Sequence, residues 1–124
     1  MTGQATREHA MSEKDWQRRV MDCAKLHGWR RVHIRVARVG TRWVTPYEGD
    51  TGLPDLILAR DGVVLLVELK AAKTPWKPGQ REWLAAAGGC GFVWRPADWA
   101  TACAVLGAPR LAATPRPETE ETPK

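Results

Sequence analysis

The chain has 124 residues, of which 44% are hydrophobic, and a net charge of +5. This length and composition suit one domain with a packed core, and without a continuous apolar run of about 18 residues we expect no membrane span. The excess positive charge favours a polyanionic partner such as nucleic acid, whereas three widely spaced cysteines argue against a disulfide framework or a zinc site and fit a reducing cytoplasm.

The chain is expected to begin with a flexible arm and one amphipathic helix. The arm covers residues 1–11, which are mostly polar and lack the apolar stretch of a signal peptide. Ser12 then offers an N-cap, and the apolar spacing predicts a helix over 13–27 that ends before Gly28. One face of this helix is formed by Trp16, Val20, Cys23 and His27.

Three strands are predicted in the middle of the chain. The alternation over 30–36 indicates a half-buried strand with Val32, Ile34 and Val36 on one face and basic residues on the other. A long connection over 37–52 follows, of a length that often carries function. Two apolar strands then occupy 55–59 and 63–69, and the Asp61-Gly62 dipeptide between them is a strong hairpin signal.

The last third of the chain predicts a crossover helix, a strand and a final helix. The helix covers 79–87 and has an apolar face of Trp83, Leu84 and Ala87 that also includes Gln80. A buried strand over 91–95 and a helix over 97–106 follow. The tail 108–124 is rich in Pro, Thr and Glu and is expected to be disordered. The order predicts one α/β domain over 12–107 with a mixed sheet.

Two carboxylates and a lysine interrupt the apolar hairpin. With Asp61-Gly62 as a two-residue loop, paired residue numbers sum to 123, so Asp55 lies across from Glu68, and Lys70 shares their face. Directly opposed side chains have Cβ atoms about 5 Å apart, so the two acids repel unless a cation lies between them. That cation can be Lys70 or a hard divalent ion such as Mg²⁺ or Mn²⁺. Solvated charges at strand ends remain the alternative.

These residues resemble a known nuclease motif. The segments GLPD (52–55) and ELK (68–70) look like the PD-(D/E)XK pattern. With Gln80 on a helix, an upstream Gly-Asp pair and the first-helix sequence, they are similar to the VRR-NUC branch, which includes small stand-alone phage and bacterial proteins. The resemblance covers about residues 12–99. It implies a restriction-endonuclease-like core in the order αβββαβ, in the cytoplasm of a bacterial or phage-infected cell.

The resemblance also implies a chemistry. It is that of a nuclease that hydrolyses phosphodiester bonds with Mg²⁺ or Mn²⁺. Asp55, Glu68 and the carbonyl of Leu69 would bind the metal, and Lys70 would orient or help to deprotonate the attacking water. This agrees with the charges of the hairpin, because a metal lowers the pKa of bound water and a nearby lysine stabilises growing negative charge.

Further site residues are carried by the two helices. The resemblance implies that Glu13 reaches the site from the first helix and that Gln80 supports it from the second. A glutamate in a first helical turn also stabilises the helix, and Asp15 is a neighbouring alternative. A buried amide needs partners, which favours a site role for Gln80. Asp50 is interpreted as an outer acid or as a turn residue, and His33 as structural or as a phosphate contact.

A basic region fits a DNA partner. Between positions 14 and 42 there are nine basic residues and two acids, although a solvated basic surface would show the same pattern. The side chains predicted to contact the phosphate backbone are Arg18, Arg19, Arg35, Arg38, Arg42, Lys73 and Lys77. Trp43 and Trp76 lie next to these charges and either stack on bases or cover the core.

The leading hypothesis is therefore a metal-dependent DNA endonuclease, structure-selective for branched, junction or flap DNA. Cutting both strands with one site per chain would need a homodimer. The alternative is a catalytically weak DNA-binding accessory protein with the nuclease fold. A restriction-type enzyme is a third possibility, disfavoured because no recognition domain is visible.

Overall fold

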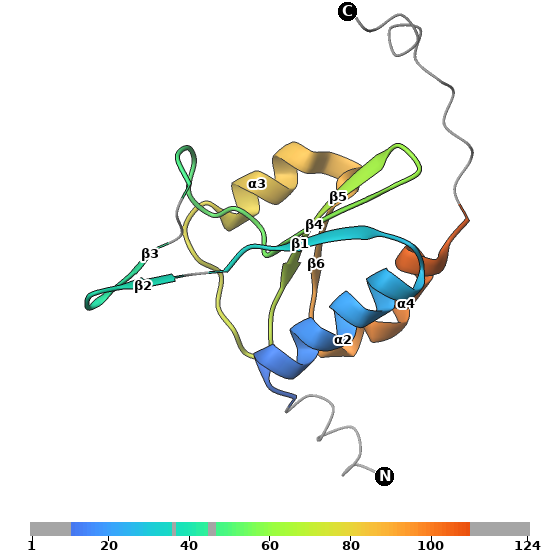
Figure 1. Cartoon of the computed structure of the whole chain (residues 1–124), viewed down its shortest axis with the longest axis horizontal. Helices are drawn as coiled ribbons and strands as arrows, with labels where there is room; N and C mark the ends of the chain where they lie inside the picture. The colour runs from blue at the N-terminus through green and yellow to red at the C-terminus, as the bar shows by residue number, and fades with distance from the viewer. Residues whose placement is uncertain (1–10, 36, 45–46, 110–124) are drawn as a thin grey trace, which may run out of the picture.

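A computed structural model describes residues 11–35, 37–44 and 47–109 (Figure 1). Four strands form the main sheet in the order β1-β4-β5-β6. They are β1 (Arg30–His33), β4 (Leu56–Arg60), β5 (Val63–Leu69) and β6 (Gly91–Trp94). The pairs β1·β4 and β4·β5 are antiparallel and β5·β6 is parallel, so the predicted mixed sheet is confirmed.

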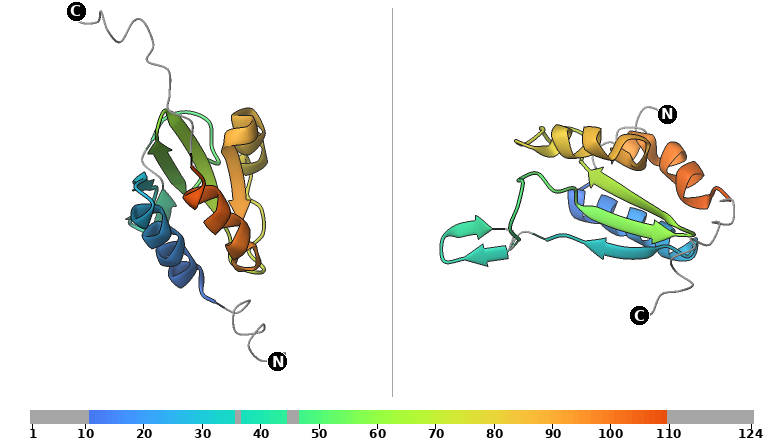
Figure 2. Two further views of the ribbon diagram at one scale, coloured as in Figure 1. Left: turned by 90° about the vertical axis from the view of Figure 1, so that its right-hand side faces the viewer. Right: turned by 90° about the horizontal axis from the view of Figure 1, so that it is seen from above.

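Three helices are described, and they cover both faces of the sheet. They are α2 (Glu13–Leu26), α3 (Gln80–Ala87) and α4 (Trp99–Gly107), with short 3₁₀ turns at Gly88–Cys90 and Pro96–Asp98. Figure 2 shows α2 and α3 on opposite sides of the strands, and α4 contacts α2. Except for Met11, Ala108 and Pro109, the predicted arm and tail lie outside the described residues. None of the described helices combines the length and apolar character needed to cross a bilayer.

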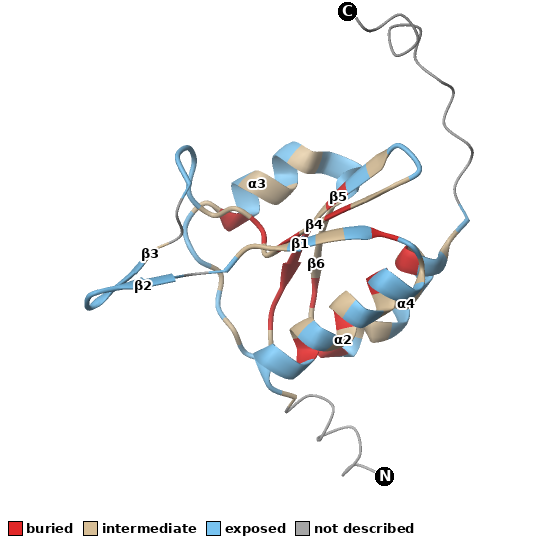
Figure 3. Cartoon of the chain, in the orientation of Figure 1, coloured by how far each residue is buried: buried red, intermediate tan, exposed pale blue. Residues whose placement is uncertain are grey.

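The core lies between the sheet and the α2–α4 pair, where buried residues concentrate (Figure 3). Trp16 and Trp94 are 0% and 2% exposed, and the Trp16 indole donates to the Trp94 carbonyl at 3.0 Å. The first helix begins as predicted, because the Ser12 side chain accepts from the Asp15 amide at 3.1 Å. It ends before Gly28, whose φ of +83° suits glycine best. Along this helix Ala24 is buried, whereas the predicted Cys23 and His27 are only partly buried.

The β4–β5 hairpin has the predicted register. Arg60 pairs with Val63 and Leu56 pairs with Val67, so paired numbers sum to 123. Asp61 and Gly62 have φ values of +52° and +79°. Positive φ at both central residues is what a two-residue type I′ loop requires, and Asp-Gly tolerates it. The turn chemistry therefore fixes which side chains face each other along both strands.

Two predictions for the preceding segment are wrong. The long connection contains a second small sheet, with β2 (Ala37–Val39) antiparallel to β3 (Arg42–Val44). Figures 1 and 2 show this β2–β3 hairpin standing away from the main sheet. Its strands are too short and too exposed to show a burial pattern.

The buried face of β1 is also the opposite of the one predicted. Val32 is 52% exposed, whereas Arg31 and His33 are partly buried. Arg31 pairs with the buried Leu58 and donates to the Met21 carbonyl of α2 at 3.3 Å. β1 is an edge strand, so a long basic side chain can cover its inner face while its guanidinium finds an acceptor. Val36, predicted on the Val32 face, lies outside the described residues.

Candidate active site

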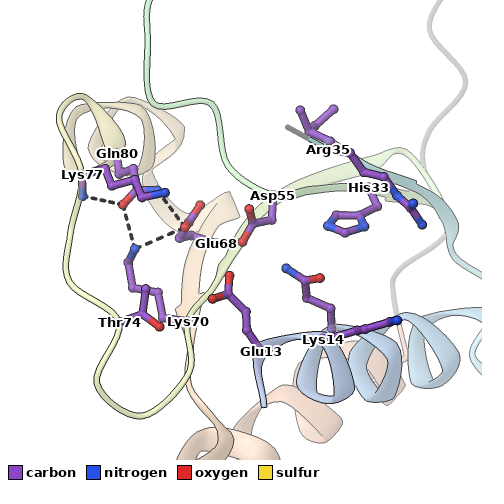
Figure 4. A pocket seen from close by; sticks show the side chains of 12 residues that line it. Glu13, Lys14, His33, Arg35, Asp55, Glu68, Lys70, Thr74, Lys77 and Gln80 are labelled. Atoms are coloured by element: carbon purple, nitrogen blue, oxygen red, sulfur yellow. Dashed lines mark hydrogen bonds and ion pairs between the residues drawn. The ribbon is translucent and has the colours of Figure 1, made fainter. Parts of the chain in front are cut away.

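A pocket of about 390 Å³ lies where β4 begins and β5 ends (Figure 4). All five side chains predicted to be catalytic line it. They are Glu13, Asp55, Glu68, Lys70 and Gln80. The hairpin supplies the two central acids and the lysine, and the first turns of α2 and α3 supply the other two. The structure therefore brings together residues that are up to 67 positions apart, from 13 to 80.

Asp55 is held in place by the two strands beside it. Its Oδ2 accepts from the Leu69 amide at 2.9 Å, and its own carbonyl accepts from the Ile34 amide at 2.7 Å. Burial is the largest influence on this carboxyl and raises its pKa above the ordinary value. Glu13 raises the pKa further, whereas the Leu69 amide, His33 and Lys70 oppose the increase. The ionised form of Asp55 is therefore less favourable in the folded protein than in water.

Glu68 is the most perturbed acid of the site. It is 3% exposed, and burial followed by repulsion from Asp55 raises its pKa to about 7, against the opposing charge of Lys70. Its Oε2 accepts from Gln80 Nε2 at 2.8 Å and from Lys70 Nζ at 3.3 Å. Its Oε1 is buried and has no hydrogen-bond partner among the described residues. One carboxylate oxygen is thus fully engaged, whereas the other makes no hydrogen bond of normal geometry with the described residues, although the nearby backbone amide of Asp55 helps to lower the pKa of the group.

Lys70 is buried to 1% exposure behind the acids. Nζ donates to Gln80 Oε1 at 2.8 Å, to the Pro75 carbonyl at 3.0 Å and to Glu68 Oε2 at 3.3 Å. An ammonium group has three protons, and here each has an acceptor. Trp76 covers this group, with its ring centroid 5.1 Å from Nζ, which supports the reading of Trp76 as a cover. Of the roles implied for Lys70, that of a fixed positive charge fits this arrangement best.

Both polar atoms of the Gln80 side-chain amide make hydrogen bonds within the site. Oε1 accepts from Lys70 Nζ and from the Lys77 amide, both at 2.8 Å, and Nε2 donates to Glu68. At 8% exposure it is the one buried residue of α3, whereas the predicted apolar face of Trp83, Leu84 and Ala87 is only partly buried. Because α3 is anchored by a polar side chain, the position of this helix is tied to the charges of β5.

The donor set suits a hard divalent cation. Carboxylate oxygens are the ligands that Mg²⁺ and Mn²⁺ prefer, and a cation would give the orphaned Glu68 Oε1 a partner and offset the repulsion from Asp55. Across 11–35, 37–44 and 47–109, no three His, Cys, Asp or Glu side chains form a metal cage. Mg²⁺ often takes only one or two carboxylates and completes its shell with water and phosphate oxygens.

The structure bears differently on Glu13, which was predicted to reach the site, and on Leu69, whose carbonyl was predicted to bind the metal. Glu13 is exposed, and Figure 4 shows its carboxylate directed toward Asp55 and Glu68. It influences the pKa of Asp55 and could join the shell of a cation from the start of α2. For Leu69 the structure shows the backbone amide bonded to Asp55, and metal binding by its carbonyl stays a prediction.

The residues predicted to bind DNA divide into three groups. Arg35 and Lys77 line the central pocket, and Arg18 lines an adjoining one. Arg38 and Arg42 are exposed on the β2–β3 hairpin, and Lys73 is exposed after β5. Arg19 lies elsewhere, with its guanidinium 4.2 Å from the ring centroid of Trp99. Three of the seven predicted cations, Arg18, Arg35 and Lys77, thus line the pocket of the acids or the one beside it, and the other four do not.

Two residues outside the predicted catalytic set also shape the site. His33 pairs with Leu56, so it lies beside Asp55 and its charge lowers the pKa of that carboxyl. Arg95 donates to the carbonyls of Ala71 at 2.5 Å, Ala72 at 3.2 Å and Thr74 at 3.0 Å, and so holds the loop that supplies the Pro75 acceptor of Lys70. No local sequence pattern predicts that β1 pairs with β4 in this register, so the position of His33 beside Asp55 could not be predicted.

Asp50, the other uncertain acid, does not line the central pocket. Its side chain is exposed, and its carbonyl accepts from the Tyr47 hydroxyl at 3.3 Å and the Trp83 indole at 3.2 Å. The backbone of this residue thus joins the loop before Asp55 to α3. The reading as a turn residue is supported.

The same loop meets the start of α3 through two glycines. A Cβ at Gly52 would lie 2.3 Å from the Gly79 carbonyl carbon, and one at Gly79 would lie 2.2 Å from the Thr51 carbonyl oxygen. Both residues also have positive φ, +94° and +85°. Only glycine permits this backbone contact, which sets the distance between Asp55 on the loop and Gln80 on the helix.

We expect Gly52→Ala to destabilise the fold by about 2 kcal/mol or more, because the added methyl group must displace the start of α3. Urea unfolding measures this loss. Gly49→Ala is a matched control, since Gly49 has a φ of +131° but no atom of the described residues within 4 Å of its Cβ position. The control should show only the cost of backbone strain. Equal losses in the two variants would mean that the glycine contact is not required.

The site is thus a buried lysine–glutamine–glutamate network beside a second carboxylate, at the mouth of a pocket with basic walls. Comparisons of the chain with protein-family models, with curated proteins and with solved structures found no match, so the assignment of function rests on the residues of this site.

Proposed function

We propose that the protein is a metal-dependent DNA endonuclease with a restriction-endonuclease-like core, related to the VRR-NUC branch of the PD-(D/E)XK nucleases. The observation that carries the proposal is the meeting of Asp55 and Glu68 in one pocket, where one buried Glu68 oxygen has no hydrogen-bond partner among the described residues. Buried polar atoms normally have a partner, and a bound ion would supply one here. The mixed α/β sheet agrees with such a core.

The residues of the chain have separable roles in this proposal. Asp55 and Glu68, with Glu13 and the Leu69 carbonyl as further candidates, hold Mg²⁺ or Mn²⁺. The bound ion supplies a lowered pKa of coordinated water and neutralises charge on the phosphate. Lys70 provides a fixed positive charge beside Glu68, and Gln80 keeps both side chains in one orientation. Around the acids, Arg35 and Lys77 attract the phosphate backbone of DNA.

The substrate is proposed to be branched, junction or flap DNA, and a homodimer would place two such sites on one substrate. The alternative is an accessory protein that binds DNA without cutting it. The two functions differ in one measurable property, which is cleavage of DNA in the presence of Mg²⁺ or Mn²⁺. Asp55, Glu68 and Lys70 all line one pocket, which favours the enzyme.

Cleavage of a substrate panel tests the function. Holliday junction, flap, splayed-arm, nicked and linear duplex DNA are incubated with the protein in Mg²⁺, Mn²⁺ or EDTA. We expect cutting with either metal and none in EDTA, with a preference for branched forms. Binding without cleavage in every metal would support the accessory protein instead. Cutting of plain duplex at fixed sequences would point to a restriction-type enzyme.

A further inference from the structure

The central pocket continues into two neighbouring hollows. A hollow of about 240 Å³ on the α2 side shares Lys14 and Arg35 with the pocket, and one of about 310 Å³ on the other side shares Asp55 and Lys77. Because the three hollows share lining residues, they adjoin one another, and we call them together the groove; both acids line its central part. We name the two outer parts the cationic end and the aromatic end.

The cationic end is lined by side chains suited to phosphate. Lys14, Arg18, Arg31 and Arg35 face it, against one acid, Asp22. None of the described Trp, Tyr and Phe side chains lines this hollow. Contacts of this kind hold the backbone of a duplex and are indifferent to its bases, which stay stacked inside the helix. This end therefore suits double-stranded DNA.

The aromatic end has a different chemistry. Trp43, on strand β3 of the projecting hairpin, is 65% exposed, and Tyr47 is 39% exposed. The Tyr47 hydroxyl donates to the Asp50 carbonyl and accepts from the Leu53 amide, both at 3.3 Å, which fixes the position of its ring. Exposed aromatic rings beside cations bind unpaired bases by stacking, and a duplex offers them no free base face.

We propose that the groove binds a junction between duplex and single-stranded DNA in one orientation, with the duplex backbone at Arg18 and an unpaired base stacked on Trp43. This deepens the proposed function, on which it rests for the role of the acids. In this orientation the acidic pair faces the nucleotides at the boundary between the two forms. Trp43 is then a specificity-determining residue, because it selects DNA that has an unpaired end on its side.

Binding measured in EDTA tests the orientation without any cleavage. The probes are a fluorescein-labelled single strand, the matching duplex, and a tailed duplex with 2-aminopurine at its first unpaired position. We expect Trp43→Ala to weaken binding of the single strand about tenfold and to remove the quenching of 2-aminopurine, while binding of the duplex stays within about twofold. Trp43→Phe should restore most of the quenching, since a phenyl ring also stacks.

Arg18→Ala should give the converse result, with weaker binding of the duplex and unchanged quenching of 2-aminopurine. Val39→Ala is the matched control, because Val39 is 61% exposed on the same hairpin but does not line the groove. Equal losses for both DNA forms in Trp43→Ala, or no loss for either, would overturn the proposal. So would a dimer that Trp43→Ala dissociates without any change in DNA binding, since the hairpin would then join two copies of the chain.

The two proposals fail separately. If the protein binds the tailed duplex in this orientation but cuts no DNA in Mg²⁺ or Mn²⁺, the endonuclease is wrong and the groove assignment stands. If it cuts DNA but Trp43→Ala weakens binding of the single strand no more than binding of the duplex, the groove assignment is wrong and the endonuclease stands.

Discussion

Asp55→Asn is expected to reduce metal-dependent cleavage by on the order of a thousandfold while it stabilises the metal-free protein above neutral pH. The Asn side-chain oxygen at position 55 can still accept from the Leu69 amide, so the local hydrogen bond is retained. The substitution removes one of the two negative charges offered to the metal. It also removes the repulsion from Asp55, which is the second-largest cause, next to burial, of the raised pKa of Glu68.

The sign of the stability change follows from the pKa of Glu68, which is about 7 in the folded chain and ordinarily 4.5. Between these values the folded state retains a proton that the unfolded state loses, so stability falls as pH rises from 4.5 to 7. With less repulsion the pKa of Glu68 is lower in the variant, and the fall is smaller. We expect the variant to gain about 1 kcal/mol at about pH 8 and little at about pH 4.

Urea unfolding in EDTA at the two pH values measures this gain, and a cleavage assay in Mg²⁺ measures the loss of activity. Asp50→Asn is the matched control, because Asp50 is an exposed acid of the preceding loop outside the central pocket. It should change neither quantity. Retained cleavage in Asp55→Asn would remove this residue from the metal site, and a loss of stability at high pH would contradict the charge repulsion.

Lys70→Met is expected to destabilise the metal-free protein by about 3–5 kcal/mol at about pH 8. Lys70 and Glu68 form an ion pair at 3.3 Å with side-chain exposures of 1% and 4%. Removing the lysine leaves a buried carboxylate without its cation, and the pKa of Glu68 rises further because Lys70 is one of the influences that lower it. Turnover should fall as well, since the fixed positive charge of the site is lost.

The destabilisation of Lys70→Met should shrink toward about pH 5, because a protonated Glu68 needs no counter-ion. Thermal or urea unfolding of variant and parent at both pH values checks this dependence. Lys73→Met, three positions away and exposed, is the control and should change stability by less than about 0.5 kcal/mol. A loss of the same size at both pH values would indicate a packing effect of the side chain rather than its charge.

The hairpin explains why so much of the site could be predicted. Asp61 and Gly62 permit a turn that few other residues accept, and this turn sets the register of every pair up to Leu56 and Val67. Side chains alternate along a strand, so the faces of Glu68 and Lys70 followed from counting. A site role for Gln80 was favoured because an amide on an apolar helix face needs hydrogen-bond partners. The structure shows Glu68 and Lys70 as those partners.

The residues outside the predicted catalytic set reach the site through contacts between distant segments. His33 reaches the site because β1 pairs with β4, and Arg95 because β6 runs beside the loop after β5. Val32 shows the same limit, since alternation of apolar and polar residues does not say which face of an edge strand an adjacent helix will cover. The β2–β3 hairpin has short, exposed strands and gave no periodic signal.

By itself, the sequence determined the order of the main elements, the turn between β4 and β5, and the acids and lysine that this turn brings together. These features depend on backbone preferences and on side-chain alternation, which act over a few residues. Only the tertiary structure decided that Lys70 is enclosed by three acceptors and that one Glu68 oxygen has no hydrogen-bond partner among the described residues. It also decided that Arg18 and Trp43 line two different hollows, each of which adjoins the central pocket. The reason is that burial and electrostatic coupling depend on how segments far apart in the chain pack together, which no local pattern specifies.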